Sequence, residues 1–130
     1  ETNADSWSLV QEGIKLIDNP EQYDYIVRTR FDKCFQNFPI ATNVQKGTII
    51  VPPWNKNAVW DEFAKGNGET AYGHPEDIVK YCNYIDVFPE LCNKDILAAN
   101  IHYSLSYYLK FYCGIEQIED HNIRDFYLKD

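Results

Sequence analysis

Near the start of the chain, an apolar residue recurs at every third or fourth position. This is the spacing of one face of an α-helix, so a helix is predicted there with its apolar stripe turned to the core. The stripe consists of Trp7, Val10, Ile14 and Ile17. Asp5 or Ser6 can cap this helix, because a short polar side chain accepts a hydrogen bond from a backbone N–H of the first turn. Asn19-Pro20 is expected to end it.

Two strands are predicted in the first half of the chain. Residues 23–28 are β-forming, and the adjacent apolar residues Tyr25–Val27 favour a strand covered on both faces in an α/β sheet. The second strand is predicted at residues 48–51 and ends at Pro52-Pro53, because proline cannot donate to an interior ladder. A phenylalanine-rich loop is expected between the strands. It contains Phe31, Phe35, Phe38 and Pro39.

Helices dominate the predictions for the second half. A short helix is predicted over Ala58–Lys65, and the glycine-rich residues 66–73 are predicted to be a loop. His74-Pro75-Glu76-Asp77 opens the next helix, because proline suits the first helical position and acidic side chains suit the positive helix end. That helix is expected to run to about Asp86.

A long helix follows. Asn93 or Asp95 can cap it, and it is predicted to extend through Tyr112 and to end at Gly114 in a left-handed turn. Its sequence is apolar nearly all round. We therefore expect this helix to be buried.

The tail of the chain alternates apolar and charged residues. This pattern over Ile115–Ile118 and Ile123–Leu128 predicts one or two edge strands. The element order is then helix, strand, strand, helices, strand. Such an order is typical of an α/β layer, and residues 1–130 are predicted to form a single domain.

Composition restricts the partners of the chain. With 130 residues, 45% of them hydrophobic, the chain can bury a core. Its formal charge of −8 argues against non-specific nucleic-acid binding, which needs a basic face. No apolar stretch approaches the roughly 20 residues that cross a bilayer, so no direct membrane span is predicted. We expect a cytoplasmic location, or the host cytoplasm if the source is viral.

The cysteines have no metal-binding pattern. Cys34, Cys82, Cys92 and Cys113 form no Cys-x-x-Cys pair and have no matching histidine spacing. They are predicted to be reduced core thiols, because a chain with an ample core does not need crosslinks. Two disulfides are the alternative.

The most informative polar cluster comes directly after the first predicted strand. Arg28, Arg30 and Asp32 would lie at the strand's carboxyl end, where ligands collect in open α/β sheets. Arginine presents a planar fork that matches phosphate oxygens, and aspartate can hold Mg²⁺ or Mn²⁺ against the same phosphates. The cluster therefore predicts a diphosphate site. A structural salt-bridge cluster is the alternative.

Candidate acid–base and sugar-binding residues follow the second strand. Asp61 and Glu62 lie beside aromatic residues, and desolvation there would raise a carboxylate pKa toward that of a general base. The alternative is an acidic pair that only stabilises a helix N-terminus. The aromatic residues can form a platform for a sugar or belong to the core. They are Trp54, Trp60 and Tyr72.

A histidine in the long helix is a further candidate metal ligand. The imidazole of His102 could complete a metal shell, whereas a hydrogen-bonded core histidine is the alternative, because no neighbour in sequence has ligand spacing.

Several other chemistries lose support. The chain has no Gly-x-x-x-x-Gly-Lys-Ser/Thr loop, no Gly-x-Gly-x-x-Gly turn and no Gly-x-Ser-x-Gly elbow, which argues against kinases, dinucleotide enzymes and α/β-hydrolases.

The order of these motifs resembles the later half of GT-A glycosyltransferases. The resemblance covers residues 23–114 and is carried by Tyr-Asp-Tyr-Ile-Val-Arg-Thr-Arg-Phe-Asp, a strand ending in proline, Asp-Glu-Phe-Ala-Lys-Gly, and Asp-Ile-Val-Lys-Tyr-Cys-Asn. It is similar to bacterial and giant-virus enzymes that build surface polysaccharides, including the small chlorella-virus type. The resemblance implies a GT-A-like mixed sheet flanked by helices.

The same resemblance implies roles for individual residues. Asp32 would be the acid at a Mn²⁺ or Mg²⁺ site, and Arg28 and Arg30 would lie close to the donor with Trp60. Asp61 would face the sugars. The chain has no methionine and begins at Glu1. We therefore expect it to be the C-terminal part of such a domain.

Two functions remain open from the sequence. The first is transfer of a sugar from a nucleotide-diphosphate donor to a carbohydrate acceptor, assisted by a metal ion. Asp61 or Glu62 would be the base if the reaction inverts. The second is a non-catalytic carbohydrate-binding or interaction module that uses the aromatic residues without a metal.

Overall fold

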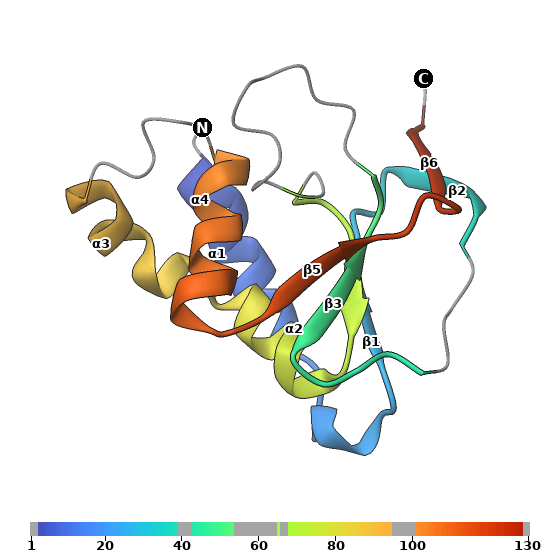
Figure 1. The fold of residues 1–130 in the computed structure, drawn as a ribbon, viewed down its shortest axis with the longest axis horizontal. Helices are drawn as coiled ribbons and strands as arrows, with labels where there is room; N and C mark the ends of the chain where they lie inside the picture. Colours follow the sequence, from blue (N-terminus) through green and yellow to red (C-terminus); the bar gives the residue numbers. More distant parts are fainter. Residues whose placement is uncertain (1–2, 39–42, 54–64, 66–67, 95–100, 129–130) are drawn as a thin grey trace.

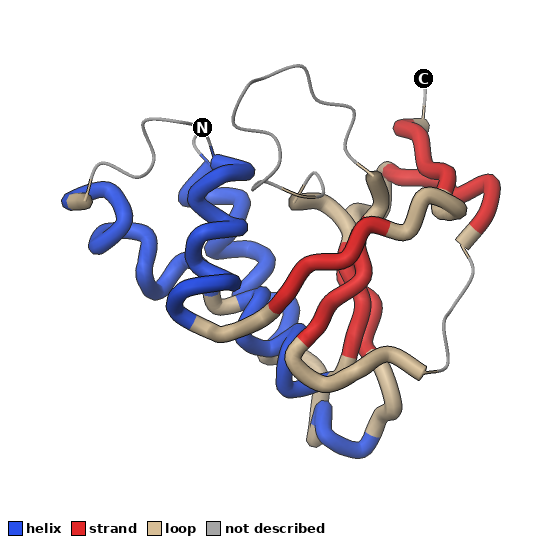
Figure 2. The backbone as a smooth tube through the Cα atoms, in the orientation of Figure 1, coloured by secondary structure: helices blue, strands red, loops and turns tan. Residues whose placement is uncertain are grey.

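Helices gather on one side of a twisted sheet in this protein (Figure 1). The structure is a computed structural model, and it describes residues 3–38, 43–53, 65, 68–94 and 101–128. The colouring of Figure 2 separates the helical side from the strands. The predicted class, a mixed α/β fold with a mixed sheet flanked by helices, is confirmed at this level.

The main sheet has four strands in the order β1-β4-β3-β5. They are β1 (Ile26–Arg28), β4 (Ala71–Gly73), β3 (Thr48–Val51) and β5 (Glu116–Glu119). Both β1 and β3 run antiparallel to β4, and β5 runs parallel to β3. The strand predicted at residues 48–51 and the edge strand predicted in the tail are therefore confirmed.

Strand β1 lies at the edge of the sheet and is exposed on one face, so the prediction that it is covered on both faces is wrong. Ile26 points into the core, whereas Val27 is 43% exposed. Successive side chains of a strand point to opposite faces, and only one face of β1 meets the helices. An unbroken apolar run does not by itself distinguish a central strand from an edge strand.

Strand β4 occupies part of the segment that was predicted to be a loop. Ala71, Tyr72 and Gly73 are all buried between β1 and β3. A Cβ atom on Gly73 would come within 3.1 Å of the Thr48 carbonyl oxygen. A side chain at this position would therefore press on the backbone of β3, so this glycine suits close strand packing, although its presence had indicated a loop.

The first helix agrees with the apolar stripe. Helix α1 (Asn3–Ile14) buries Trp7, and Val10, Ile14 and Ile17 pack against the same core. The helix ends at Ile14, so the predicted end at Asn19-Pro20 is wrong, and a 3₁₀ turn, η1 (Pro20–Gln22), follows further along the chain. Asp5 and Ser6 lie within the helix and do not cap it. Periodicity located the helix, because the stripe is contiguous in sequence, but it did not give the ends of the helix.

The predicted helix from His74 to Asp86 divides into shorter elements. Helix α2 (Pro75–Cys82) begins at the proline as expected, and a 3₁₀ helix, η2 (Tyr84–Val87), continues the path. Helix α3 (Phe88–Asn93) follows. Asn93 is therefore the last residue of α3 and does not cap the next helix, while Asp95 lies outside the described residues.

The described part of the long helix is α4 (Ile101–Tyr107), which continues into a π-helical turn, η4 (Tyr108–Tyr112). Gly114 has the predicted left-handed conformation, with φ 69°. The prediction of complete burial is wrong at the end of the helix, because Phe111 is 59% exposed. Only one face of this segment packs on the core, and its last turn extends beyond the sheet.

A small second sheet covers the far face of the main sheet. Strands β2 (Lys33–Asn37) and β6 (Arg124–Tyr127) pair antiparallel, so Phe35 lies in a strand and not in the predicted loop. Phe35 and Phe38 pack on Tyr72 and Ile123. The second strand predicted in the tail is therefore present, but its partner is β2.

The cysteines are free thiols, as predicted. Cys82 is buried, and Cys34 and Cys113 are half-buried, whereas Cys92 is exposed and so is not the expected core residue. Among the helices that the structure describes, none is long and apolar enough to cross a membrane.

Candidate functional site

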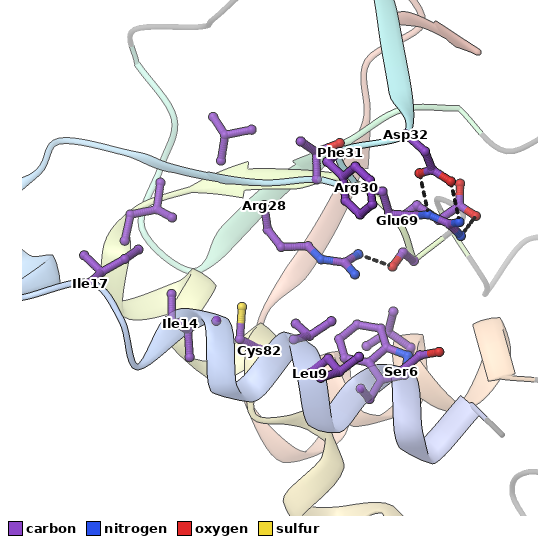
Figure 3. A pocket seen from close by; sticks show the side chains of 18 of the residues that line it. Ser6, Leu9, Ile14, Ile17, Arg28, Arg30, Phe31, Asp32, Glu69 and Cys82 are labelled. Atoms are coloured by element: carbon purple, nitrogen blue, oxygen red, sulfur yellow. Dashed lines mark hydrogen bonds and ion pairs between the residues drawn. The ribbon is translucent and has the colours of Figure 1, made fainter. Parts of the chain in front are cut away.

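A cavity of about 1260 Å³ opens between α1 and the end of β1 (Figure 3). Helix α1 forms one wall and β1 with the turn after it forms the other. Figure 3 shows Ile14 and Ile17 at one end and Arg30, Asp32 and Glu69 at the other, with Arg28 reaching between the walls. The cavity therefore has an apolar end and a charged end.

Four of the predicted site residues line this one cavity. They are Arg28, Arg30, Asp32 and His102. Strand β1 and the turn after it supply the first three, and α4 supplies the histidine. The structure thus brings together residues that are 70 or more positions apart in the sequence.

Other predicted site residues lie elsewhere. Asp61, Glu62, Trp60 and Trp54 lie outside the described residues. Tyr72 is fully buried in the core, where its ring packs on that of Phe38 at 5.5 Å between centroids. The prediction that Tyr72 could belong to a sugar platform is therefore wrong.

Arg28 is a half-buried cation whose described contacts include no carboxylate. Its Nη1 donates a hydrogen bond of 2.6 Å to the Gly68 carbonyl oxygen. Its guanidinium carbon lies 5.3 Å from the centroid of the Trp7 ring, within the range of a cation–π contact. Within the described residues it forms no ion pair.

Arg30 is bound by Asp32. Its Nε and Nη2 donate to the two oxygens of Asp32 at 2.9 and 2.8 Å, a fork-to-fork pair. This hydrogen bonding raises the pKa of Arg30 and lowers that of Asp32. Arg30 Nη1 also lies 3.3 Å from Glu69 Oε2. Both side chains are well exposed, so the pair contributes little to stability.

Glu69 joins this cluster to the small sheet. Its Oε1 lies 2.9 Å from the Nζ of Lys33, and its Oε2 accepts a hydrogen bond from the Tyr127 hydroxyl. Burial opposes the charge of Glu69, but these contacts and Arg30 outweigh it and hold its pKa below the ordinary value. Sequence reasoning missed Glu69, Lys33 and Tyr127, because nothing in their spacing shows that they meet.

The described side chains do not by themselves form a metal shell. Both oxygens of Asp32 accept hydrogen bonds from Arg30, and no three His, Cys, Asp or Glu side chains of the described part converge on one point. Mg²⁺ requires about six oxygen ligands. Burial lowers the pKa of His102, with an opposing effect of Glu69. Metal binding at Asp32 and His102 stays a prediction.

Tyr81 and Cys82 of α2 lie beneath Arg28. Burial raises the pKa of the Tyr81 hydroxyl to about 12 and that of the Cys82 thiol to about 11, and the charge of Arg28 opposes both shifts. The Tyr81 hydroxyl has no hydrogen-bond partner in the described chain. Cys82 lines the cavity but is protonated at neutral pH, so it is a poor nucleophile.

Comparisons with protein-family models, curated proteins and solved structures found no match. The function of the chain is therefore inferred from the chemistry of the cavity. The cavity has three chemical features: an arginine that has no carboxylate partner among the described residues, an ion-paired arginine beside it, and an apolar wall.

Proposed function

We propose that the chain is the C-terminal part of a GT-A-like glycosyltransferase that transfers a sugar from a nucleotide-diphosphate donor to a carbohydrate acceptor. The observation that carries this proposal is Arg28, whose guanidinium lines the cavity and has no carboxylate partner in the described chain. A phosphate is a suitable partner, because its oxygens match the arginine fork.

The charges around the cavity also favour an anionic ligand there. The protein as a whole carries a formal charge of −8, which repels anions at long range. Among the described residues that line the charged end, however, two cations, Arg28 and Arg30, accompany two carboxylates, Asp32 and Glu69. Both carboxylates contact Arg30, so Arg28 is the cation that would hold a phosphate group.

The two arginines would have different roles. Arg28 would bind the diphosphate directly, because its described contacts, such as those with the Gly68 carbonyl and the Trp7 ring, are with neutral groups. Arg30 would have to leave Asp32 and Glu69 first, so its contribution would be smaller. Neutralising the leaving diphosphate favours breakage of the bond between it and the sugar C1, and electrostatic stabilisation of this kind is a large catalytic term.

The acceptor hydroxyl oxygen would form the new bond to C1 and lose its proton to a base. Asp61 or Glu62 is the base predicted from the sequence, and both lie outside the described residues. The participation of Mn²⁺ or Mg²⁺ in the reaction also stays a prediction. Titration of the chain with the nucleotide, first with added Mn²⁺ and then with added EDTA, tests whether nucleotide binding needs the metal ion. If nucleotide binding requires the metal ion, Asp32 is the predicted ligand of that ion.

Calorimetric titration of the chain with UDP, GDP, CDP and ADP tests the proposal. We expect at least one nucleotide to bind, and Arg28→Gln to weaken it by about tenfold or more through loss of a charged hydrogen bond. Arg124→Gln is the matched control. Arg124 also donates to a backbone carbonyl, that of His121, and lies on β6 away from the cavity.

Two results would count against the proposal. One is that none of these nucleotides binds to the folded chain. The other is that Arg28→Gln and Arg124→Gln bind the nucleotide equally well. Thermal unfolding of both variants shows whether each has kept its fold, which matters because Arg28 also contacts the Trp7 ring.

A carbohydrate-binding module is the second candidate. The observation that favours it is Phe31, which lines the cavity and is 98% exposed, because an exposed aromatic ring can pack on the apolar face of a sugar. This function predicts binding of neutral oligosaccharides that is insensitive to EDTA, to Asp32→Ala and to Arg28→Gln. Phe31→Ala would abolish it.

A further inference from the structure

The apolar end of the cavity is not accounted for by a nucleotide sugar. Leu9, Val10, Ile14 and Ile17 line it from the α1 side, and Ile26 lines it from β1. Leu9 is 74% exposed, and Val10, Ile14 and Ile17 are half-buried. A sugar and a diphosphate are mostly polar and would leave the exposed surface of Leu9 without an apolar partner.

Gly13 keeps this part of the cavity open. It lies within α1 and lines the cavity, and a Cβ atom on it would meet no atom of the described chain within 4 Å. Glycine is less favourable than alanine inside a helix, and no neighbouring atom requires it here. Its effect is to leave room beside the apolar side chains of α1.

Arg28 lies at the boundary between the two ends. Figure 3 shows its side chain between the apolar residues Ile14 and Ile17 and the charged cluster of Arg30, Asp32 and Glu69. Since its guanidinium has no carboxylate partner in the described chain, an anionic group is the complementary one. An apolar chain that ends in an anion would match the wall and the arginine together.

We propose that the cavity binds an anionic amphiphile, with its hydrocarbon chain between α1 and β1 and its anionic head against Arg28. The head would occupy the guanidinium that the proposed function assigns to the donor diphosphate, so the amphiphile and the nucleotide would compete for Arg28. The head can be a phosphate or a carboxylate, since both match a guanidinium fork. A lipid phosphate and a fatty acid are the two sources of this chemistry.

Four ligands, each kept below its micelle concentration, test the proposal by calorimetry on the 130-residue chain. Decyl phosphate and decanoate should both bind. The one that binds more tightly shows whether the ligand is a lipid phosphate or a fatty acid. Decyl glucoside lacks the charge and inorganic phosphate lacks the chain, so each should bind at least about tenfold more weakly. Shortening the chain from decyl to octyl should weaken binding by about tenfold.

Matched variants separate the apolar wall from the rest of the surface. Leu9→Asp should weaken decyl phosphate binding by about tenfold or more, whereas Leu16→Asp should change it by less than about twofold. Leu16 is 83% exposed and does not line the cavity. Gly13→Leu should block the chain to a similar extent, and Gly13→Ala, which adds one methyl group in open space, should be nearly neutral.

The outcomes distinguish this inference from the proposed function. Weaker decyl phosphate binding in Leu9→Asp, with unchanged nucleotide binding, supports the inference. Equal binding of decyl phosphate by wild type, Leu9→Asp and Gly13→Leu overturns it, as does equal binding of decyl phosphate and inorganic phosphate. Failure of every nucleotide to bind, with the amphiphile results intact, overturns the proposed donor and leaves the amphiphile site in place.

Discussion

At the scale of single residues, the charged end of the cavity is organised by Glu69. Its carboxylate contacts the cations of Arg30 and Lys33 and the hydroxyl of Tyr127. Lys33 Nζ also lies 4.1 Å from the centroid of the Tyr127 ring. Because the Lys33 side chain is only 5% exposed, the carboxylate that faces it has a structural role as well as an electrostatic one.

Replacing this carboxylate should therefore weaken the fold. We expect Glu69→Gln to lower the free energy of unfolding by about 2 kcal/mol at pH 7, because the largely buried Lys33 side chain loses a counter-charge. Urea unfolding followed by circular dichroism measures the change. The matched control is Glu12→Gln, whose exposed pair with Lys15 should contribute less than about 0.5 kcal/mol.

The same residue predicts a pH dependence. The folded-state pKa of Glu69 lies below its ordinary value of 4.5, so its stabilising effect is present above that pH and is lost as the pH falls through the folded-state pKa. The deficit of Glu69→Gln relative to wild type should thus shrink between pH 6 and pH 3. A deficit that stays constant over this range would show that the charge of Glu69 is not responsible.

At the scale of elements, strand β4 is the element on which the sheet depends. It lies between β1 and β3 and fixes the register of both through Gly73, which faces Ile26 on one side and Ile49 on the other. The missing side chain allows the Thr48 carbonyl to come close. A glycine that indicates a turn in the sequence is here a condition for strand packing.

Two glycine-to-alanine variants should behave in opposite ways. Gly73→Ala places a Cβ 3.1 Å from a backbone oxygen, which cannot move without shifting β3, and should cost about 1–3 kcal/mol of stability. Gly13→Ala adds its methyl in open space and should stabilise the helix by up to about 1 kcal/mol. Thermal and urea unfolding of the two variants measure the difference. A neutral Gly73→Ala would mean that β3 and β4 pack less closely than described.

At the scale of the whole molecule, α1 is both a part of the core and a wall of the cavity. Trp7 anchors it, with edge-on ring contacts to Tyr81 and Tyr84 at 5.4 and 5.0 Å between centroids. The face of the helix beside Trp7 carries Leu9 and Gly13, which line the cavity. Loss of the Trp7 ring would therefore lower both the stability of the fold and the affinity of the cavity for a ligand.

Removing the indole tests this dual role. Trp7→Ala should lower the free energy of unfolding by about 3–5 kcal/mol, the range for truncating a large buried aromatic side chain. Phe31→Ala removes a ring that is 98% exposed and should change stability by less than about 0.5 kcal/mol. Chemical unfolding of both variants under the same conditions makes the comparison, and similar losses would contradict the described packing of α1.

Several features were predictable because their cause is local. The stripe that begins at Trp7 and the proline that opens α2 specified two helices, and the residues from Thr48 to Val51 specified β3. Arg28, Arg30 and Asp32 were identified as a group because they are adjacent in sequence. Each of these features depends on interactions between residues a few positions apart in the chain. Hydrophobic periodicity and residue type indicate such interactions directly.

Other features depend on residues that are distant in sequence. The carbonyl that binds Arg28 lies 40 positions away, and the carboxylate that binds Tyr127 lies 58 positions away. The position of β1 at the edge, the burial of β4 and the pairing of β2 with β6 also depend on such contacts. No local pattern encodes them, because each partner is chosen by how the whole chain packs.

The sequence by itself determined the place of α1, the start of α2, the strand at Thr48–Val51 and the presence of an arginine-rich cluster after the first strand. Only the tertiary structure decided that Arg30 is bound by Asp32 and Glu69 while Arg28 has no carboxylate partner within the described residues. It also decided that an apolar helix face lies beside that cluster. The physical reason is that charge pairing and burial are set by distances in space, which sequence separation does not report.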